Sequence, residues 1–388
     1  MSRPSLSIFY IATAVSITTL GDSLFYTILP SYYPHIGLLP IQVGILLSIN
    51  RWIRLATNHT AEYCYRRFPS TYWLIFALLM GSMVTAIYGI ARLFIILLGA
   101  RILWGISFSF IRQAALMTVI QSGSEVHRVG QRMGYYRGFD AIWRTSGVFL
   151  GGISHDVFGF TFTFVAVSLL ALITVPLGVL SQKRLQILQT PLAKAKDIPG
   201  KGEPWVICCG FAGSLVSGGM ILSTLGFILK EKVGESFGIA GYSIGVATLT
   251  GTILGLKWFS EWMSPLWGTI GDRAGRERFI TFLFAVGTAS LVPITIHPNP
   301  ILLFIGILMF FICGTTLYTL LVAQAGLAGP RSLASFLTAN DLGMSLGPLI
   351  GWSIAQWGLP TNFIFITGGV FYFIGMVISF YGPKKHTE

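Results

Sequence analysis

The stretch "PLWGTIGDRAGRERF", residues 265–279, lies between two long apolar segments and decides how the chain is organised. Its three glycines permit a tight turn and a close approach of helices. Asp272 can accept hydrogen bonds at the N-terminus of a neighbouring helix, where the helix dipole favours an anion, and the arginines can clamp carboxylates or lipid phosphates. A related stretch, "LATNHTAEYCYRRF" at residues 55–68, repeats the acid and the base four residues apart, as Glu62 and Arg66.

The chain around these two stretches has the composition of a membrane protein. Only 10% of its 388 residues are charged and 53% are hydrophobic, with a mean hydropathy of +0.72, whereas about a quarter of the residues of a soluble protein are charged. Each apolar run of about 20 residues can cross about 30 Å of hydrocarbon as a helix. The runs are continuous rather than alternating, which excludes a β-barrel. We therefore predict an all-α polytopic membrane protein whose twelve spans lie at residues 7–30, 38–58, 71–91, 94–120, 133–156, 160–182, 204–229, 237–262, 279–296, 300–326, 333–356 and 360–381.

The net charge of +12 reports on topology rather than on nucleic-acid binding. Lysine and arginine concentrate at both termini and in the even-numbered connections, while the odd-numbered connections hold only Arg92, Lys230 and Lys232. Positively charged connections stay on the cytoplasmic side, so we expect both termini in the cytoplasm. The short connections are typical of a bacterial inner-membrane protein, and anionic lipid heads are expected partners of its basic side.

The longest polar interval, residues 183–203, divides the spans into two sets of six. It is basic, contains two prolines and two glycines, and is typical of a cytoplasmic linker. We expect one six-helix bundle at residues 1–182 and a second at residues 204–388. A second repeat supports this duplication, because "SGVFLGG" (146–152) in the fifth span matches "LGPLIGW" (346–352) in the eleventh.

In its span count, linker and loop positions, the chain resembles the major facilitator superfamily, whose signature loop runs Gly-x-x-x-Asp-Arg-x-Gly-Arg after the second span of each half. The copy at residues 268–276 is intact, whereas the first-half copy has glutamate for aspartate, and asparagine and tyrosine for two glycines. The resemblance implies two six-helix bundles related by pseudo-symmetry, with loop residues that latch the cytoplasmic side when it is shut. We assign this conformational latch to Glu62, Arg66, Gly268, Asp272, Arg273 and Arg276.

Two further motifs carry the resemblance. Arg101-x-x-x-Gly105 in the fourth span resembles the membrane arginine motif of the family, and "GMSLGPLIG" (343–351) resembles its glycine-proline motif. The second motif falls in the eleventh span, and in the fifth span Val148 stands where the proline would be. In the family, this motif in the fifth span is associated with drug–proton antiporters, so its absence there argues against an antiporter.

Apart from Asp156 at the last position of the fifth span, eleven charged residues fall within the predicted spans. Each costs about 2.5–3.5 kcal/mol at the centre of a membrane helix, so their default interpretation is functional. Asp22 and Arg101 both lie about 11 Å below the outer surface, from their positions in spans one and four at 1.5 Å per residue. We therefore predict that they form a pair. This pair resembles the acid and arginine of proton-coupled family members, so we assign it to proton coupling.

A second group of charges lies nearer the inner ends of spans two, four and five. Their forked guanidinium groups suit carboxylate or phosphate, so an anionic solute is the simplest explanation of their excess. Neighbouring aromatic residues suit a solute that also has apolar bulk. The alternative is that the arginines are structural, tied to helix carbonyls and to Glu261 and Asp341. The predicted solute-binding residues are Arg51, Arg112, Arg137, Asp140, Arg144, Tyr26, Trp52 and Trp143.

These observations favour a secondary transporter that moves a small organic anion by alternating access, coupled to protons. Polycarboxylates, organic phosphates and carboxylate siderophores are the solute classes considered. The alternative is a proton-driven exporter of drugs or amphipathic molecules, and a third possibility is a receptor without transport on the same scaffold. We find no metal spacing, phosphate loop or nucleophile elbow, so we expect no enzyme, no catalytic residue, no cofactor and no metal. The expected partners are the anionic solute, protons and membrane lipids, with the protein a monomer.

Overall fold

The structure is a computed structural model that describes residues 6–67, 70–122, 129–186, 203–239, 242–296 and 300–382. Most of the predicted linker therefore lies outside the described residues. The first half contains α1 (Leu6–Ile36), α2 (Pro40–Arg67), α3 (Ser70–Ile90), α4 (Phe94–Gln121) and α5 (Val129–Phe158), with a sixth span made of α6 (Phe160–Leu172) and α7 (Thr174–Gln186).

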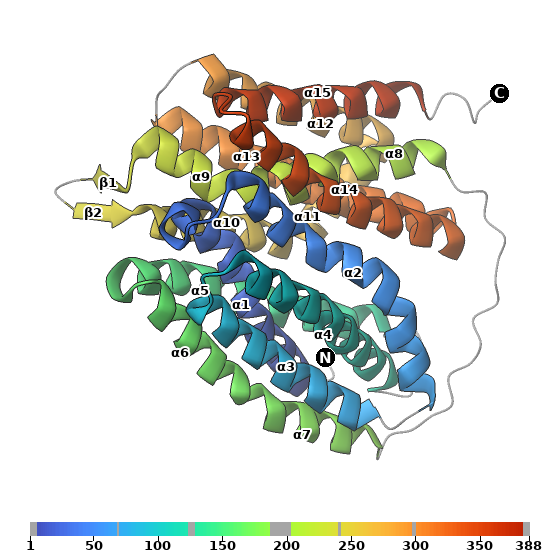
Figure 1. The fold of residues 1–388 in the computed structure, drawn as a ribbon. Helices are drawn as coiled ribbons and strands as arrows, with labels where there is room; N and C mark the ends of the chain where they lie inside the picture. Colours follow the sequence, from blue (N-terminus) through green and yellow to red (C-terminus); the bar gives the residue numbers. More distant parts are fainter. Residues whose placement is uncertain are drawn as a thin grey trace.

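The second half repeats this order with more interruptions. Its first span contains α8 (Pro204–Gly213), the π-helix η2 (Ser214–Met220) and α9 (Ile221–Val233), and its second contains α10 (Val246–Trp262) and α11 (Ser264–Ala274). The remaining spans are α12 (Arg276–Ile296), α13 (Pro300–Leu327), α14 (Pro330–Gln356) and α15 (Asn362–Tyr381). In Figure 1, α1 to α7 fill the lower part of the molecule and α8 to α15 the upper part. The expected fold, two six-helix bundles related by pseudo-symmetry, is confirmed.

The predicted span at residues 237–262 is wrong at residues 237–239 and 242–245. Strand β1 (Ser236–Ile239) and strand β2 (Tyr242–Gly245) form an antiparallel hairpin there, and the helix begins only at Val246. Three glycines in "FGIAGYSIG" (237–245) explain the difference, because glycine in a helix interior costs about 1 kcal/mol relative to alanine.

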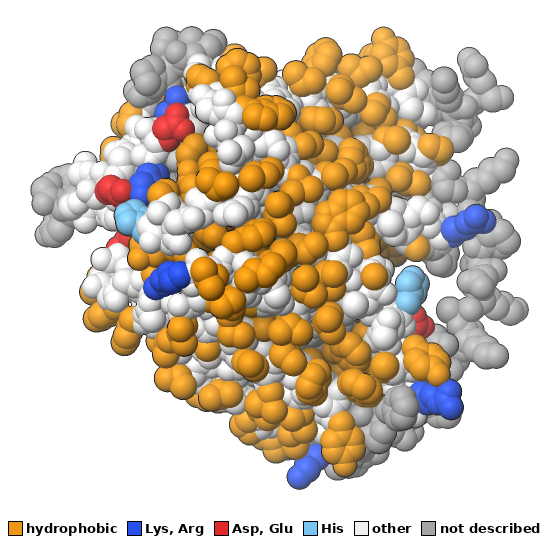
Figure 2. Space-filling view, in the orientation of Figure 1, with side chains coloured by type: hydrophobic (Ala, Val, Ile, Leu, Met, Phe, Trp, Pro, Cys, Tyr) orange, Lys and Arg blue, Asp and Glu red, His pale blue; other side chains and the backbone are white. Residues whose placement is uncertain are grey.

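Charge divides the helices into two groups. Among the described residues, eight helical segments are long and apolar enough to cross a membrane by length and composition alone. The four spans that this criterion leaves out are α2, α5, α10 and α14, which carry most of the charges within the spans. These helices pack in two pairs between the halves, α2 against α14 and α5 against α10. We call these contacts the α2–α14 seam and the α5–α10 seam. In Figure 2, apolar side chains cover the broad middle of the visible surface, with charged side chains toward its two sides.

The glycine repeats of the fifth and eleventh spans serve equivalent contacts. Gly147 and Gly151 of α5 lie against Leu20 and Leu24 of α1, where an added Cβ would come within 2.0 Å of each leucine. In the second half, an added Cβ on Gly347 of α14 would lie 2.2 Å from the Leu215 carbonyl oxygen in η2. In both halves, therefore, the small residues of the fifth span allow close packing against the first span, which is the pseudo-symmetry expected from the repeat.

The two halves are packed together at one end of the bundle, which we call the hairpin end because it holds β1 and β2 (Figure 1). Across the α5–α10 seam, an added Cβ on Gly152 would lie 2.5 Å from the Ala247 carbonyl oxygen. Near the same end, the Asp156 carboxylate accepts hydrogen bonds from the backbone N–H (2.8 Å) and the hydroxyl (2.6 Å) of Thr248, in the first turn of α10. The carboxylate of one half therefore caps a helix of the other half.

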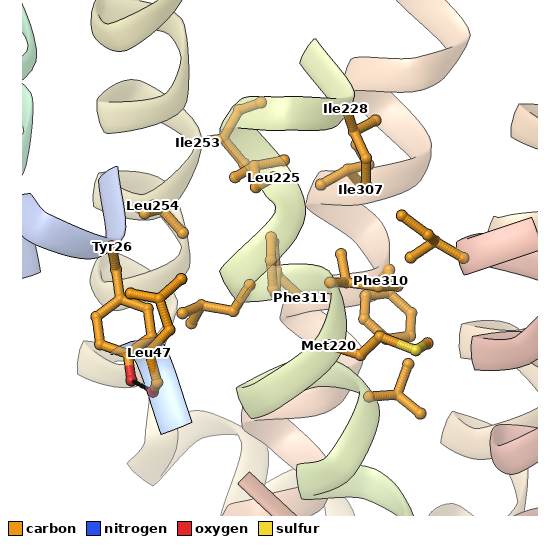
Figure 3. Close-up of a cluster of buried hydrophobic side chains, with 14 of the residues drawn as sticks. Tyr26, Leu47, Met220, Leu225, Ile228, Ile253, Leu254, Ile307, Phe310 and Phe311 are labelled. Carbon is orange, nitrogen blue, oxygen red and sulfur yellow. Dashed lines mark hydrogen bonds between the residues drawn. The ribbon is translucent and has the colours of Figure 1, made fainter. Parts of the chain in front are cut away.

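A continuous apolar core joins the halves near this end. Figure 3 shows Tyr26 of α1 beside Leu47 of α2 and close to Leu254 of α10. Farther into the second half, Leu225 of α9 packs in the same cluster as Phe311 of α13. This core holds the first helices of the two halves together.

The halves separate toward the opposite end, which holds the start of α1 and the end of α15 and which we call the termini end. One stripe of α14 shows this, because Trp352 is fully buried near Gly44 of α2 while Ala334 and Thr338 are exposed. On α5, an added Cβ on Gly138 would still lie 3.5 Å from the Trp262 indole of α10, whereas one turn nearer the termini end Gly134 has no atom within 4 Å and Arg137 is exposed. The structure is therefore closed at the hairpin end and open at the termini end.

Candidate functional site

Asp22 of α1 and Arg101 of α4 form an ion pair in the middle of the first half, which is the contact predicted from their depths. Arg101 is fully buried, and its Nε donates to the Leu46 carbonyl oxygen at 2.7 Å. Its Nη1 donates to Asp22 and to the Tyr88 hydroxyl at 3.3 Å. Arg101 is thus fixed by the protein, while the Asp22 side chain keeps 24% of its surface exposed. The assignment of this pair to proton coupling stays a prediction.

Aromatic rings surround the Arg101 guanidinium. Its central carbon lies 5.1 Å from the ring centre of Phe25, 5.5 Å from that of Tyr26 and 5.8 Å from that of Tyr88. Rings at such distances attract a cation through their electron-rich faces. The Tyr26 hydroxyl donates to the Leu47 carbonyl oxygen, so this O–H is not free to donate to a solute.

Two more arginines of α2 point toward the middle of the protein with unused hydrogen-bond donors. Arg51 lies over the Tyr26 ring at 5.6 Å, and its buried Nη1 has no hydrogen-bond partner. Arg54 lies over the Phe108 ring at 5.0 Å, and its buried Nε also has no partner. Its Nη2 lies 3.9 Å from the Asp341 carboxylate across the α2–α14 seam. A buried N–H without a partner costs free energy, so these donors favour a ligand that accepts hydrogen bonds.

The charged stripe of α5 is neutralised only in part. Asp140 pairs with Arg144, one turn away, and accepts a hydrogen bond from Ser16 of α1 at 3.1 Å. Arg144 also lies 5.6 Å from the ring centre of Trp258, which α10 contributes from the other half. The side chains of Arg144 and Asp140 are 30% and 17% exposed.

Arg137 faces the space between the halves rather than the outer surface. The outer side of α5 carries Ile142 and Leu150, which are 45% and 60% exposed. Successive residues turn about 100° around a helix, which places Arg137 and Arg144 on the opposite side, between the faces that contact α1 and α10. The exposed Arg137 therefore lies at the termini end beside the α5–α10 seam.

Charges from both halves converge on Tyr318 of α13. Its hydroxyl lies in the electrostatic range of Arg112 and Arg137 from the first half and of Glu261 and Asp341 from the second. Without Asp156 at the hairpin end of the fifth span, the predicted spans hold seven basic and four acidic residues, which leaves three positive charges in excess. The residues counted are Arg51, Arg54, Arg101, Arg112, Arg137, Arg144 and Lys257 against Asp22, Asp140, Glu261 and Asp341.

The structure does not bring two of the predicted aromatic residues to the arginines beside them in sequence. Successive side chains on a helix point about 100° apart, so Trp143 and Arg144 point in different directions from α5. The ring that covers Arg144 belongs to Trp258. The Trp52 indole donates to the Ser48 hydroxyl at 3.0 Å, and the ring is 37% exposed. Four residues of the site, Arg54, Asp341, Trp258 and Tyr318, were not in the predicted solute-binding set, although Asp341 was expected as a partner of any structural arginine. The sequence held a signal for two of these residues, because Arg54 and Asp341 are charged residues within predicted membrane spans.

The predicted latch is described only in part. The side chains of Arg66 and Asp272, and the surroundings of Gly268, lie outside what the structure describes. Arg273 is exposed at the end of α11, and Gly275 has a φ of +84°, a left-handed conformation that glycine adopts without strain. The turn of the signature loop therefore has its expected geometry. The latch role of Glu62, Arg66, Gly268, Asp272, Arg273 and Arg276 stays a prediction.

The part of the chain that the structure describes contains no cluster of three or more metal-ligating side chains. The architecture is that of a membrane transporter rather than an enzyme, with two six-helix halves and charged helices along their seams. The chain belongs to the Major Facilitator Superfamily, whose sequence profile matches residues 11–329.

The comparisons with known proteins agree on this fold. A relative from Proteus mirabilis (strain HI4320), "Multidrug resistance protein MdtG", is 23% identical over 95% of this chain and 94% of its own length. A bacterial homologue of the human lysosomal transporter Spinster, in an inward-facing conformation, superposes with a TM-score of 0.73 at 15% identity, covering 99% of this chain and 98% of that one. An inward-facing bacterial homologue of the iron transporter ferroportin gives 0.72 at 13% identity, covering 98% and 99% of the two chains.

Proposed function

We propose that this protein is a proton-driven exporter of amphipathic organic compounds that carry a negative charge. It works as a monomer in a bacterial inner membrane, with both termini in the cytoplasm. The observation that carries the proposal is the set of arginines between the halves, which have unused N–H donors and lie over aromatic rings. A guanidinium group binds a carboxylate or phosphate, and the neighbouring rings bind apolar bulk.

The relative named as a multidrug resistance protein supports export of varied compounds rather than uptake of one metabolite. It favours the exporter that the sequence left as the alternative over a carrier of polycarboxylates, organic phosphates or carboxylate siderophores. The missing glycine-proline motif of the fifth span is a weaker argument, because Gly147 and Gly151 still provide the close packing at that position. The excess of positive charge between the halves then favours exported compounds that carry a negative charge.

The conformation supports the direction of transport. With the basic connections in the cytoplasm, the termini end faces inward, so the open state loads its solute from the cytoplasm. Arg137 lies at this open end, where it meets an arriving anion first. Asp22, held by the buried Arg101, is the group that takes up and releases the proton. Closing the termini end and opening the hairpin end then releases the solute outside.

Transport by purified protein in liposomes tests the proposal. Three solutes separate the possibilities: naphthoate, naphthylmethylammonium with the same ring system and opposite charge, and citrate as a polycarboxylate without a ring. We expect a proton gradient, imposed in the export direction, to drive naphthoate movement and to leave the other two near the rate of empty liposomes. Movement of naphthylmethylammonium alone refutes the anionic selectivity. Movement of citrate but not naphthoate restores the small-anion carrier as the better hypothesis.

A further inference from the structure

The α2–α14 seam contains an ion pair whose geometry differs from that of the other pairs in the spans. The Arg54 Nη2 and the Asp341 carboxylate are 3.9 Å apart, beyond the 2.7–2.9 Å of a charge-assisted hydrogen bond. Both side chains are largely buried, at 14% and 18% exposed. The Arg54 Nε has no partner, although the Phe108 ring packs against the guanidinium. Arg54 therefore has a nearby counter-ion without the hydrogen bonds that a better placed carboxylate would make.

The surroundings of Arg54 favour a second anion. Arg51 and Arg112 are the charges of like sign that act on it, and Asp341 and Asp22 are the charges of opposite sign. Asp22 already pairs with Arg101, so Asp341 is the main carboxylate left to balance these arginines. A solute carboxylate is not attached to a helix, so it can move to the geometry that Asp341 lacks.

We propose that Asp341 is an internal counter-ion which an anionic solute displaces from Arg54, and that this exchange makes Asp341 a specificity-determining residue of the transporter. This inference rests on the proposed function, since it assumes that the solute is an anion bound between the halves. Only a solute with its own negative charge replaces the lost pairing. Neutral and cationic solutes leave Arg54 with Asp341.

The exchange also acts on the contact between the halves. Asp341 is one helical turn before Ser345, and the Ser345 carbonyl oxygen accepts a hydrogen bond from the Ser48 hydroxyl of α2 across the seam. Ser345 itself donates to the Asp341 carbonyl oxygen at 2.6 Å. The Arg54–Asp341 pair and the Ser48–Ser345 contact therefore join the same two helices within two turns of each other, so loss of the pair leaves fewer polar contacts across the seam. Anion binding loosens the α2–α14 seam.

Binding of naphthoate to the purified full-length protein tests the exchange. We compare the wild type with Asp341→Asn, which keeps the shape and removes the competing charge. Because Arg54 then has no competing carboxylate at 3.9 Å, we expect the variant to bind naphthoate about fivefold more tightly, which corresponds to about 1 kcal/mol. In the background of Arg54→Gln the gain disappears, because the two substitutions act on one contact. The matched control is Glu235→Gln, which removes an acid at the hairpin end and leaves the affinity unchanged.

The proposed exchange is overturned if Asp341→Asn binds naphthoate with the same affinity as the wild type or more weakly. It is also overturned if the gain in affinity persists in the Arg54→Gln background. A second measurement needs no change at Asp341. In a background with the native cysteines replaced by serine, naphthoate accelerates maleimide labelling of Ser345→Cys, which is fully buried and keeps the carbonyl oxygen that Ser48 contacts. No acceleration contradicts the coupling. The wild-type preference between naphthoate and naphthylmethylammonium reports separately on the proposed function. If the wild type binds naphthoate but Asp341→Asn binds it no more tightly, only this inference is refuted and the proposed function stands.

Discussion

Removing the carboxylate of Asp156 should open the hairpin end. This side chain, at the end of α5, accepts two hydrogen bonds from Thr248 in the first turn of α10. Gly245 leaves room for the contact, because an added Cβ there would lie 2.3 Å from the Asp156 carboxylate. Each hydrogen bond contributes about 0.5–1.5 kcal/mol, and an anion at a helix N-terminus adds about 0.3–1 kcal/mol. Since Asp156 is exposed, we take the low values, which together give about 1.3 kcal/mol, or nearly a tenfold shift toward the open hairpin end.

The assay is maleimide labelling of Ala247→Cys, which lies fully buried at the α5–α10 seam, in a background without native cysteines. We expect Asp156→Ala to raise the labelling rate about tenfold, because labelling follows the open population. Asp156→Asn keeps one acceptor oxygen and should give an intermediate rate, while Glu235→Gln should give the rate of the parent. A labelling rate in Asp156→Ala equal to that of the parent would refute the capping argument.

Three further predictions concern the seams and the buried pair. Asp22→Asn leaves Arg101 buried without its counter-ion, so it should lower the free energy of unfolding by about 3 kcal/mol and abolish the dependence of transport on the proton gradient; thermal unfolding and liposome transport at two pH values check this, and retained proton dependence would contradict the coupling role. Gly347→Ala should lower the free energy of unfolding by about 1–3 kcal/mol because it forces α14 from η2, whereas Gly369→Ala, with nothing within 4 Å, should not; equal stabilities in thermal unfolding would exclude the close contact. Arg137→Gln should weaken naphthoate binding about threefold, the low end for losing one exposed charge at the entrance; calorimetry measures this, and an unchanged affinity would place Arg137 outside the binding path.

Much of the fold could be predicted because periodicity and charge report directly on a membrane helix. The span order, the two halves and the signature turn follow from apolar run length and from the glycines of residues 265–279. The contact of Asp22 with Arg101 followed from depth alone, because both side chains lie inside one half where the helix order limits the choice. The hairpin at residues 236–245 was missed because its apolar residues raise the hydropathy of the segment whichever structure it adopts.

The seam contacts could not be predicted in the same way. Whether Arg54 meets Asp341, or Trp258 meets Arg144, depends on which faces of α2, α14, α5 and α10 meet, and a single sequence does not specify this pairing. The arrangement of Trp143 was foreseeable, since adjacent residues on a helix point about 100° apart and cannot share a face.

The central claim is that arginines between the two halves hold the negative charge of an amphipathic solute. The most direct test is calorimetric titration of the wild-type protein with naphthoate and with naphthylmethylammonium, paired with Arg51→Gln. The account predicts that naphthoate binds, that naphthylmethylammonium does not, and that Arg51→Gln weakens naphthoate binding about tenfold, as expected for the loss of a charged hydrogen bond. Tighter binding of naphthylmethylammonium, or naphthoate binding that is indifferent to Arg51→Gln, would contradict it.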